Sequence, residues 1–234
     1  MNTDTEFKFY NGVIGWPIFL VWLLWLVYWV ELKFGFNFND LGVYPRTFSG
    51  LRGIFCSPFI HGSVKHLYSN SIPLAVLLAL LFLFYRNVKW KVLVFGVLST
   101  GIFTWLLARP AYHIGASGII YFLFSFIFFK GIFSKYYRLI AISLMVIFLY
   151  GGLMWYVFPV DETISWEGHL SGFIAGILGA MMFHKRNQIS TYNTSSNLDV
   201  LTYEDAFLRH FDENGNFIPT SEMEKENDIE IDEK

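Results

Sequence analysis

The sequence predicts an all-α membrane protein with six transmembrane helices, and three observations lead to this prediction. Of the 234 residues, 54% are hydrophobic and 15% are charged, whereas soluble domains have about 45–50% and about 25%. The chain contains 26 Phe and 8 Trp, which is more large apolar surface than one small core can bury. Six apolar runs approach the roughly 20 residues that cross a bilayer as a helix. Lipid is therefore the expected solvent for most of the chain.

The expected helices are separated by short connections, except after the first. They cover residues 11–32, 66–85, 90–108, 117–129, 136–158 and 168–184. The fourth run is too short to cross a bilayer alone, so we expect a short central helix that begins below the surface and is shielded by its neighbours. The long first loop, residues 33–65, is rich in Phe and Leu and too apolar for disorder, so we expect it to be partly interfacial.

The basic residues of the connections predict the orientation, because Lys and Arg gather on the cytoplasmic side of a membrane. With a cytoplasmic N-terminus, nine basic residues fall inside: Lys8, Arg86, Lys89, Lys91, Lys130, Lys135, Arg138, Lys185 and Arg186. Five fall outside: Lys33, Arg46, Arg52, Lys65 and Arg109. We therefore expect a multi-pass protein of the inner (cytoplasmic) membrane with both termini in the cytoplasm.

The last part of the chain differs in composition from the rest. From Lys185 to Lys234 there are 12 acidic and 5 basic residues, although the net charge of the whole chain is only −2. A segment with so little apolar content cannot build a core. We therefore divide the chain into a membrane domain, residues 1–186, and an acidic, mostly disordered cytoplasmic tail, residues 187–234.

The strongly polar residues gather at one end of the expected helices. In a six-helix topology the second, fourth and sixth helices all begin on the outer side, and polar residues or glycines occur at each start. They are His61, His66 and Asn70, then His113, Gly115, Ser117 and Gly118, then His169, Ser171 and Gly172. Polar groups within membrane spans are costly and usually mark a site. The pattern therefore predicts a functional site that opens to the extracytoplasmic side.

A serine and a histidine in this cluster have the positions that nucleophilic catalysis needs. Ser117 begins the fourth helix, where free backbone N–H groups favour a developing anion. His169 begins the sixth helix and can act as general base and acid for the serine hydroxyl. His66 and Asn70 are four residues apart on one helix face, so both can donate hydrogen bonds toward a common point.

Small residues on the sixth helix predict how these groups meet. Gly172, Gly176 and Ala180 recur every four residues, so a neighbouring helix can approach closely. If that neighbour is the fourth helix, which carries Gly118, the stripe brings the serine and the histidine within reach. Each feature alone also has a plainer explanation: a serine that bonds its own backbone, a histidine at an interface, or glycines that only pack.

Three motifs on three helices resemble the signature set of rhomboid proteases. They are His61-x4-His66-x3-Asn70, Gly115-Ala116-Ser117-Gly118 and His169-x2-Gly172. The resemblance covers roughly residues 10–185 and implies a six-helix rhomboid-like bundle. It implies an intramembrane serine protease with Ser117 as nucleophile and His169 as its partner, without an acidic third member.

The resemblance also implies roles for the surrounding residues. The oxyanion hole would consist of the Ser117 N–H with the side chains of His66 and Asn70, and the Tyr121 ring would stack on the catalytic histidine. Supporting roles fall to His61, Gly115, Gly118, Gly172 and Gly176. The implied partners are the lipid bilayer and the transmembrane segments of substrate proteins, with no cofactor, no metal and no nucleic acid. Two features depart from the family pattern: the loop Gly42-Val43-Tyr44-Pro45-Arg46 lacks the Trp-Arg pair of many relatives, and the acidic tail has no counterpart.

Other functions fit the sequence less well. An inactive, client-binding relative of the same fold usually lacks the serine or the histidine, and this chain has both. A transporter would place histidines at several depths, whereas these lie on one side. Neither the His-Glu-x-x-His motif of zinc proteases nor the Gly-x-Ser-x-Gly elbow of soluble hydrolases is present. The inactive relative and, less favoured, the transporter are the alternatives to a protease.

Overall fold

The structure is a computed structural model that describes residues 10–134, 136–160, 164–183, 210, 216, 217 and 219. The chain divides into two units, residues 1–187 and 188–234, and the account below concerns the first. The predicted disordered tail lies outside the described residues, apart from the four isolated positions above 187, as do His184 and the basic residues that follow it.

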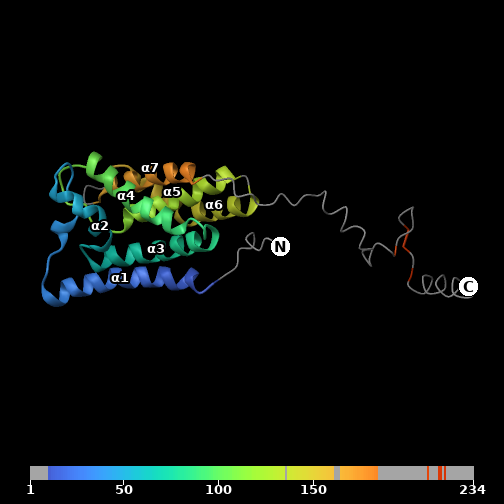
Figure 1. Cartoon of the computed structure of the whole chain (residues 1–234), viewed down its shortest axis with the longest axis horizontal. Coiled ribbons are helices and arrows are strands. Elements are labelled where there is room, and N and C mark those ends of the chain that lie inside the picture. The colour runs from blue at the N-terminus through green and yellow to red at the C-terminus, as the bar shows by residue number, and fades with distance from the viewer. Residues whose placement is uncertain are drawn as a thin grey trace, which may run out of the picture. The chain divides into compact units, whose positions relative to one another are not determined.

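Within the described residues the first unit is helical and has no β-strand. The long helices are α1 (Gly12–Phe34), α3 (Val64–Phe84), α4 (Lys89–Leu107), α5 (Ser117–Ser134), α6 (Tyr137–Tyr150) and α7 (Trp166–Met182), and they lie side by side (Figure 1). Shorter turns are α2 (Gly53–Cys56) and the 3₁₀ helices η2 (Asn39–Leu41), η3 (Ser49–Arg52), η4 (Ser57–Phe59) and η5 (Gly151–Val157). All six predicted positions are therefore helical.

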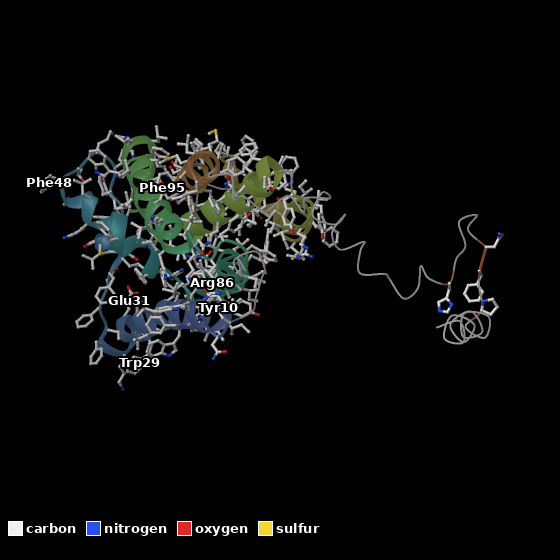
Figure 2. The ribbon with its side chains drawn as sticks, turned by 45° about the vertical axis from the view of Figure 1, so that its right-hand side comes forward. Tyr10, Trp29, Glu31, Phe48, Arg86 and Phe95 are labelled. Carbon is white, nitrogen blue, oxygen red and sulfur yellow. The ribbon has the colours of Figure 1, made fainter. Side chains whose placement is uncertain are left out.

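Five of the described helices are long and apolar enough to cross a membrane: α1, α3, α4, α5 and α6 with η5. The sixth, α7, has 17 residues. Their outer surfaces suit lipid: Trp29 of α1 is 54% exposed and points away from the bundle (Figure 2). Large apolar side chains on so many outward faces would be a liability in water. The prediction of an all-α, multi-pass membrane protein is thus supported, and the crossing of six spans stays a prediction.

The prediction of a short fourth helix is wrong in length. Helix α5 has 18 residues and continues to Ser134, about 27 Å at 1.5 Å per residue. Lys130 interrupts the apolar run in the sequence, but its Nζ is buried and donates a hydrogen bond to the Phe183 carbonyl at 2.7 Å. The charge is therefore satisfied inside the bundle and does not end the helix. The helix is nevertheless central, since 61% of its residues are buried against 17% for the corresponding stretch of α1.

Two other helices differ from their predicted bounds because of local structure. Helix α3 begins at Val64, two residues before the predicted start, because the Ser63 hydroxyl accepts a hydrogen bond from the His66 N–H at 3.1 Å and caps the helix. The predicted helix over residues 136–158 is α6 followed by the tighter turns of η5. That change of winding brings the carbonyls of the η5 residues toward α5 and α7.

The first connection, residues 35–63, is held by hydrogen bonds to α4 and to the segment between α4 and α5. Val43 and His113 exchange backbone hydrogen bonds of 3.0 and 2.9 Å. Arg46 donates to the Ala108 carbonyl at 3.0 Å, and the Trp105 indole donates to the Thr47 carbonyl at 2.8 Å. These bonds hold the connection against the C-terminal end of α4 and the segment that precedes α5. Its placement in the membrane interface stays a prediction.

Candidate active site

A tight turn places Ser117 at the first residue of α5. Gly115 has φ of +107°, a conformation that residues with a Cβ rarely adopt. A Cβ at this glycine would lie 2.7 Å from His66 Cε1 and 3.6 Å from Asn70 Nδ2. The glycine thus lets the backbone before Ser117 approach the side chains of His66 and Asn70 on α3.

The imidazole of His169 is held by two contacts. Its Nδ1 lies 2.9 Å from the Tyr156 carbonyl oxygen, which can only accept, so Nδ1 carries the proton and Nε2 has a free lone pair. The Tyr121 ring stacks on the imidazole with a centroid distance of 4.2 Å and an interplanar angle of 11°. The Tyr121 hydroxyl in turn donates to the Leu153 carbonyl at 2.9 Å. Both contacts fix the plane of the ring, and η5 supplies both carbonyls.

Helices α5 and α7 approach each other at the level of their backbones. A Cβ on Gly172 would overlap the Gly118 carbonyl oxygen, and a Cβ on Gly176 would lie 2.5 Å from the Phe122 oxygen. This contact brings Tyr121, one turn after Ser117, onto His169. The nucleophile and base candidates therefore occupy the same end of two adjoining helices, although no hydrogen bond joins the Ser117 hydroxyl to His169 in the described structure.

Two α3 residues and a histidine before α3 complete the cluster. Asn70 is 6% exposed and its Nδ2 has no hydrogen-bond partner among the described residues. The rings of His61 and His66 meet edge to face with centroids 5.1 Å apart. His61 Nε2 accepts a hydrogen bond of 3.4 Å from the Ala116 N–H. Burial, and then the neighbouring His66, lower the pKa of His61 to about 4, so it is neutral at pH 7 and can support the turn before Ser117 as an acceptor.

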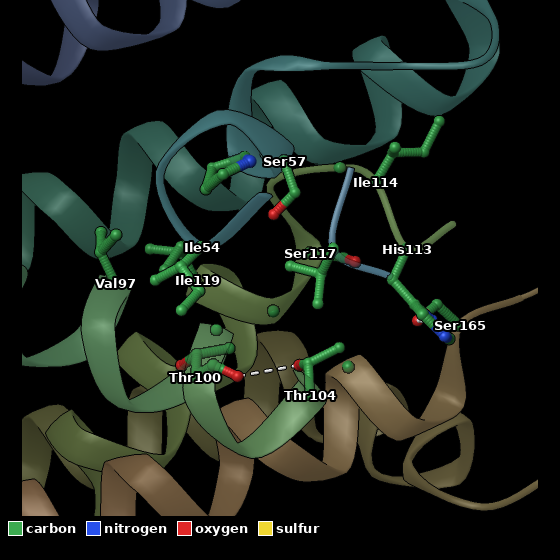
Figure 3. Close-up of a pocket in the computed structure, with 16 residues that line it drawn as sticks. Ile54, Ser57, Val97, Thr100, Thr104, His113, Ile114, Ser117, Ile119 and Ser165 are labelled. Atoms are coloured by element: carbon green, nitrogen blue, oxygen red, sulfur yellow. Dashed lines mark hydrogen bonds between the residues drawn. The ribbon is translucent and has the colours of Figure 1, made fainter. Parts of the chain in front are cut away.

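A small cavity adjoins Ser117. Its volume is about 40 Å³, room for about three or four water molecules at about 10–15 Å³ each. Figure 3 shows Ser117, Ser57, His113 and Ser165 around it. Thr100 Oγ1 also borders it and is buried without a hydrogen-bond partner in the described structure. Sequence reasoning missed Thr100 and Thr104, although two threonines four residues apart in an apolar run could have indicated a polar helix face.

Comparison with known proteins is consistent with this geometry. A model of the Rhomboid domain matches residues 49–186.

The chain belongs to the rhomboid family.

The rhomboid match extends from η3 to α7 and contains every residue of the cluster described above. Two similar curated proteins come from mycobacteria. The uncharacterized protein Rv1337 of Mycobacterium tuberculosis is 35% identical over 170 residues, and the aligned region covers 68% of this chain and 70% of that protein. The uncharacterized protein ML1171 of Mycobacterium leprae is 32% identical over 176 residues, covering 68% and 67%. Their names assign no activity, so the chemistry of this rhomboid must be argued from its own residues.

A polar network fastens the start of α7 to the connection before α5. His113 Nε2 lies 3.0 Å from the Arg109 carbonyl, which can only accept, so Nδ1 accepts a 2.6 Å hydrogen bond from the Ser165 hydroxyl. Burial lowers the pKa of His113, which favours this neutral form. Arg109 and Glu167 form an ion pair at 3.2 Å, in which the glutamate side chain is 5% exposed and the arginine 39%. The network anchors α7 two residues before His169.

Replacing Glu167 with Gln is expected to destabilise this rhomboid by about 1–2 kcal/mol. This loss of stability lies between the cost of breaking an exposed ion pair and that of breaking a buried one, because Arg109 is partly solvated. Thermal unfolding of the purified protein in detergent measures it. Asp40→Asn, at an exposed acidic residue of the first connection, is the matched control and should change little. Equal unfolding temperatures for the two variants would show that the ion pair does not anchor α7.

Proposed function

We propose that this rhomboid is an intramembrane serine endopeptidase that cleaves transmembrane segments of other membrane proteins. Ser117 is the nucleophile and His169 is the general base. The observation that carries the proposal is the state of the His169 imidazole: its Nδ1 donates to the Tyr156 carbonyl, which leaves Nε2 as a base at the same end of the bundle as Ser117. The backbone carbonyl performs the orienting task that a carboxylate has in other serine hydrolases.

The reaction uses one proton carrier and one nucleophile. His169 Nε2 takes the proton of the Ser117 hydroxyl as Oγ attacks the carbonyl carbon of the scissile peptide. The tetrahedral intermediate collapses, His169 gives the proton to the leaving amine, and an acyl ester on Ser117 remains. A water molecule, deprotonated by the same Nε2, then attacks the ester carbon. The bond from that carbon to Ser117 Oγ breaks, His169 returns the proton to Oγ, and the new carboxyl group is released. The small cavity with Thr100 Oγ1 is suited to supply that water.

The charge that develops on the substrate oxygen needs donors that are already in place. Ser117 is the first residue of α5, and N–H groups of a first helical turn have no partner within the helix. Asn70 Nδ2 is buried without a partner in the described structure and lies toward the turn at Gly115. An orphaned buried donor costs folding free energy, so a catalytic use explains it. His66, beside the same turn, is the third donor.

His66→Ala and Asn70→Ala are each expected to lower kcat/KM by roughly 10²-fold, the effect of removing one oxyanion donor. The fall should lie mainly in kcat, because the donors act on charge that exists only in the transition state. Lys65→Ala, at an exposed neighbour on the same helix, should keep near wild-type kinetics. If both site variants kept wild-type kcat, these residues would serve packing alone.

The orientation and membrane are part of the proposal. The described acidic residues Glu31, Asp40 and Glu167 all lie at the end of the bundle that carries the site, together with five basic residues, whereas the other end has described basic residues such as Arg86, Lys89 and Lys91 and no described acidic one. This imbalance of charge supports cytoplasmic termini and a site that opens to the extracytoplasmic face of the inner membrane, with six spans.

The decisive experiment is cleavage in proteoliposomes. The purified full chain is reconstituted with single-span substrates that carry helix-breaking residues near their outer end, since a helical backbone must unwind before Ser117 can attack. Two fragments with a defined cut site are expected, together with labelling of Ser117 by a fluorophosphonate. Stable binding of these substrates with neither cleavage nor labelling would instead support the inactive, client-binding alternative.

A further inference from the structure

A second and larger cavity lies between α1, the first connection and α4. Its volume is about 300 Å³, and every lining residue is aliphatic, aromatic or proline. The lining includes Leu24 of α1, Phe59 of the first connection, Leu78 of α3, Trp90 and Leu98 of α4, and Ile119 of α5. An apolar cavity offers water no partners and stays dry. Its occupant must therefore be apolar.

This apolar cavity opens on the lipid-facing side of the bundle. Phe55, Trp90 and Val94 line it and are 61%, 43% and 59% exposed, so they form its rim. Trp90 and Leu98 are eight residues apart on α4, about 12 Å, and one leaflet of a bilayer has a hydrocarbon depth of about 15 Å. The cavity thus has the composition and the length to take an acyl chain that enters sideways from a leaflet.

The end of the cavity at Trp90 carries positive charge. The Arg86 guanidinium lies over the Tyr10 ring at 4.7 Å, and Lys89 Nζ donates to the Tyr10 hydroxyl at 2.9 Å. Figure 2 shows Tyr10 and Arg86 together at this end. Lys91, in the first turn of α4, is exposed. Among the described residues no acidic side chain lies at this end of the bundle, and the three basic side chains attract an anionic group.

We propose that the apolar cavity binds one acyl chain of a phospholipid whose anionic head group lies at Arg86, Lys89 and Lys91. The chain would pass Trp90 and end under the first connection. Its deepest contacts would be Ala116 and Ile119, which line the cavity and flank Ser117. The Ala116 N–H is also the group that bonds His61. A bound chain thereby supports the turn that positions the nucleophile, and this regulatory part rests on the proposed function.

Lipid retention tests the binding site without any cleavage assay. The full chain, purified in detergent and exposed to equal amounts of phosphatidylglycerol and phosphatidylcholine, is examined by native mass spectrometry. One tightly retained phosphatidylglycerol per chain is expected. Leu98→Trp fills the cavity and should lower its occupancy by about tenfold or more, since two lost CH₂ contacts suffice for that factor. Ile102→Trp, at an exposed position of α4 outside the lining, should retain the lipid.

The head-group contacts are tested separately, in case Leu98→Trp does not fold. The double variant Arg86→Gln, Lys91→Gln changes two exposed side chains and should remove the preference for phosphatidylglycerol over phosphatidylcholine, whereas Lys33→Gln at the other end of α1 should keep it. Equal retention of both lipids by the wild type, unchanged retention by Leu98→Trp, or a second copy of the chain in place of lipid would each overturn the proposal.

The effect of the bound lipid on catalysis is tested by measuring cleavage rates in vesicles of phosphatidylglycerol and in vesicles of phosphatidylcholine. Wild type and Ile102→Trp should cleave faster with phosphatidylglycerol than with phosphatidylcholine, and Leu98→Trp should show no difference. Specific lipid retention without any cleavage would contradict the proposed function and leave the lipid site standing. Cleavage that is the same in both vesicles, despite specific retention, would overturn the regulatory part alone.

Discussion

Ser117→Ala is expected to abolish cleavage, with a fall in rate of about 10⁴-fold or more, while the protein stays folded. The change removes the nucleophile, and it deletes only a hydroxyl that is half-buried and makes no hydrogen bond in the described structure. His169→Ala should cost a similar factor because it removes the base. The double variant should be no slower than either single one, since the two groups act as a unit. Single-turnover cleavage in proteoliposomes gives the rates, and thermal unfolding gives the stability.

Ser69→Ala is the matched control for the serine. Its hydroxyl is on the exposed side of α3 and donates to the His66 carbonyl of its own helix, so cleavage should be unchanged. Fluorophosphonate should label the wild type and Ser69→Ala, but not Ser117→Ala. If Ser117→Ala or His169→Ala cleaved within tenfold of the wild type, the assignment of the dyad would be wrong.

The positions of the helices could be predicted from the sequence because lipid-facing helices are apolar on nearly every side. Such runs stand out without knowledge of their partners. The polar cluster could be predicted for a related reason: a polar group in an apolar run is rare, so His66, Ser117 and His169 are conspicuous. Alternating direction then places the starts of the second, fourth and sixth helices at one end. The family match confirms the resemblance drawn from these motifs.

Features that depend on a partner from another element could not be predicted. The carbonyl that satisfies Lys130 belongs to Phe183, more than 50 residues away. Arg109 is predicted from the sequence to lie in an outer loop, but its ion pair with Glu167, 58 residues later, could not be predicted. From the glycine stripe alone, Phe173 is expected to face outward on the sixth helix, but its ring packs against Phe124 and Phe129. In each case the element that carries the residue is visible in the sequence, whereas the element that it faces is not.

The glycine stripe of α7 is the feature whose replacement should do the most damage without touching a reacting group. Gly172→Ala is expected to lower the cleavage rate by about 10²-fold or more, because its Cβ would overlap the Gly118 carbonyl and backbone cannot yield as a flexible side chain does. Gly176→Ala should act alike through the Phe122 carbonyl. The helices must separate, and a shift of about 1 Å between catalytic groups costs roughly 10²-fold. Overpacking should also lower stability by about 1–3 kcal/mol.

Gly179→Ala makes the same substitution farther along the same helix and separates backbone contact from the mere addition of a methyl group. Its Cβ would lie 3.3 to 3.4 Å from the rings of Phe126, Phe95 and Phe122, side chains that can move by tenths of an ångström. The cleavage rate should therefore stay within a few-fold of the wild-type rate, and so should the rate of Leu178→Ile at an exposed position. The rates are compared for variants that are inserted into the membrane to the same extent and are equally stable. Equal rates for Gly172→Ala, Gly176→Ala and Gly179→Ala would remove the close approach of α5 and α7 from the mechanism, since only the first two force the backbones apart.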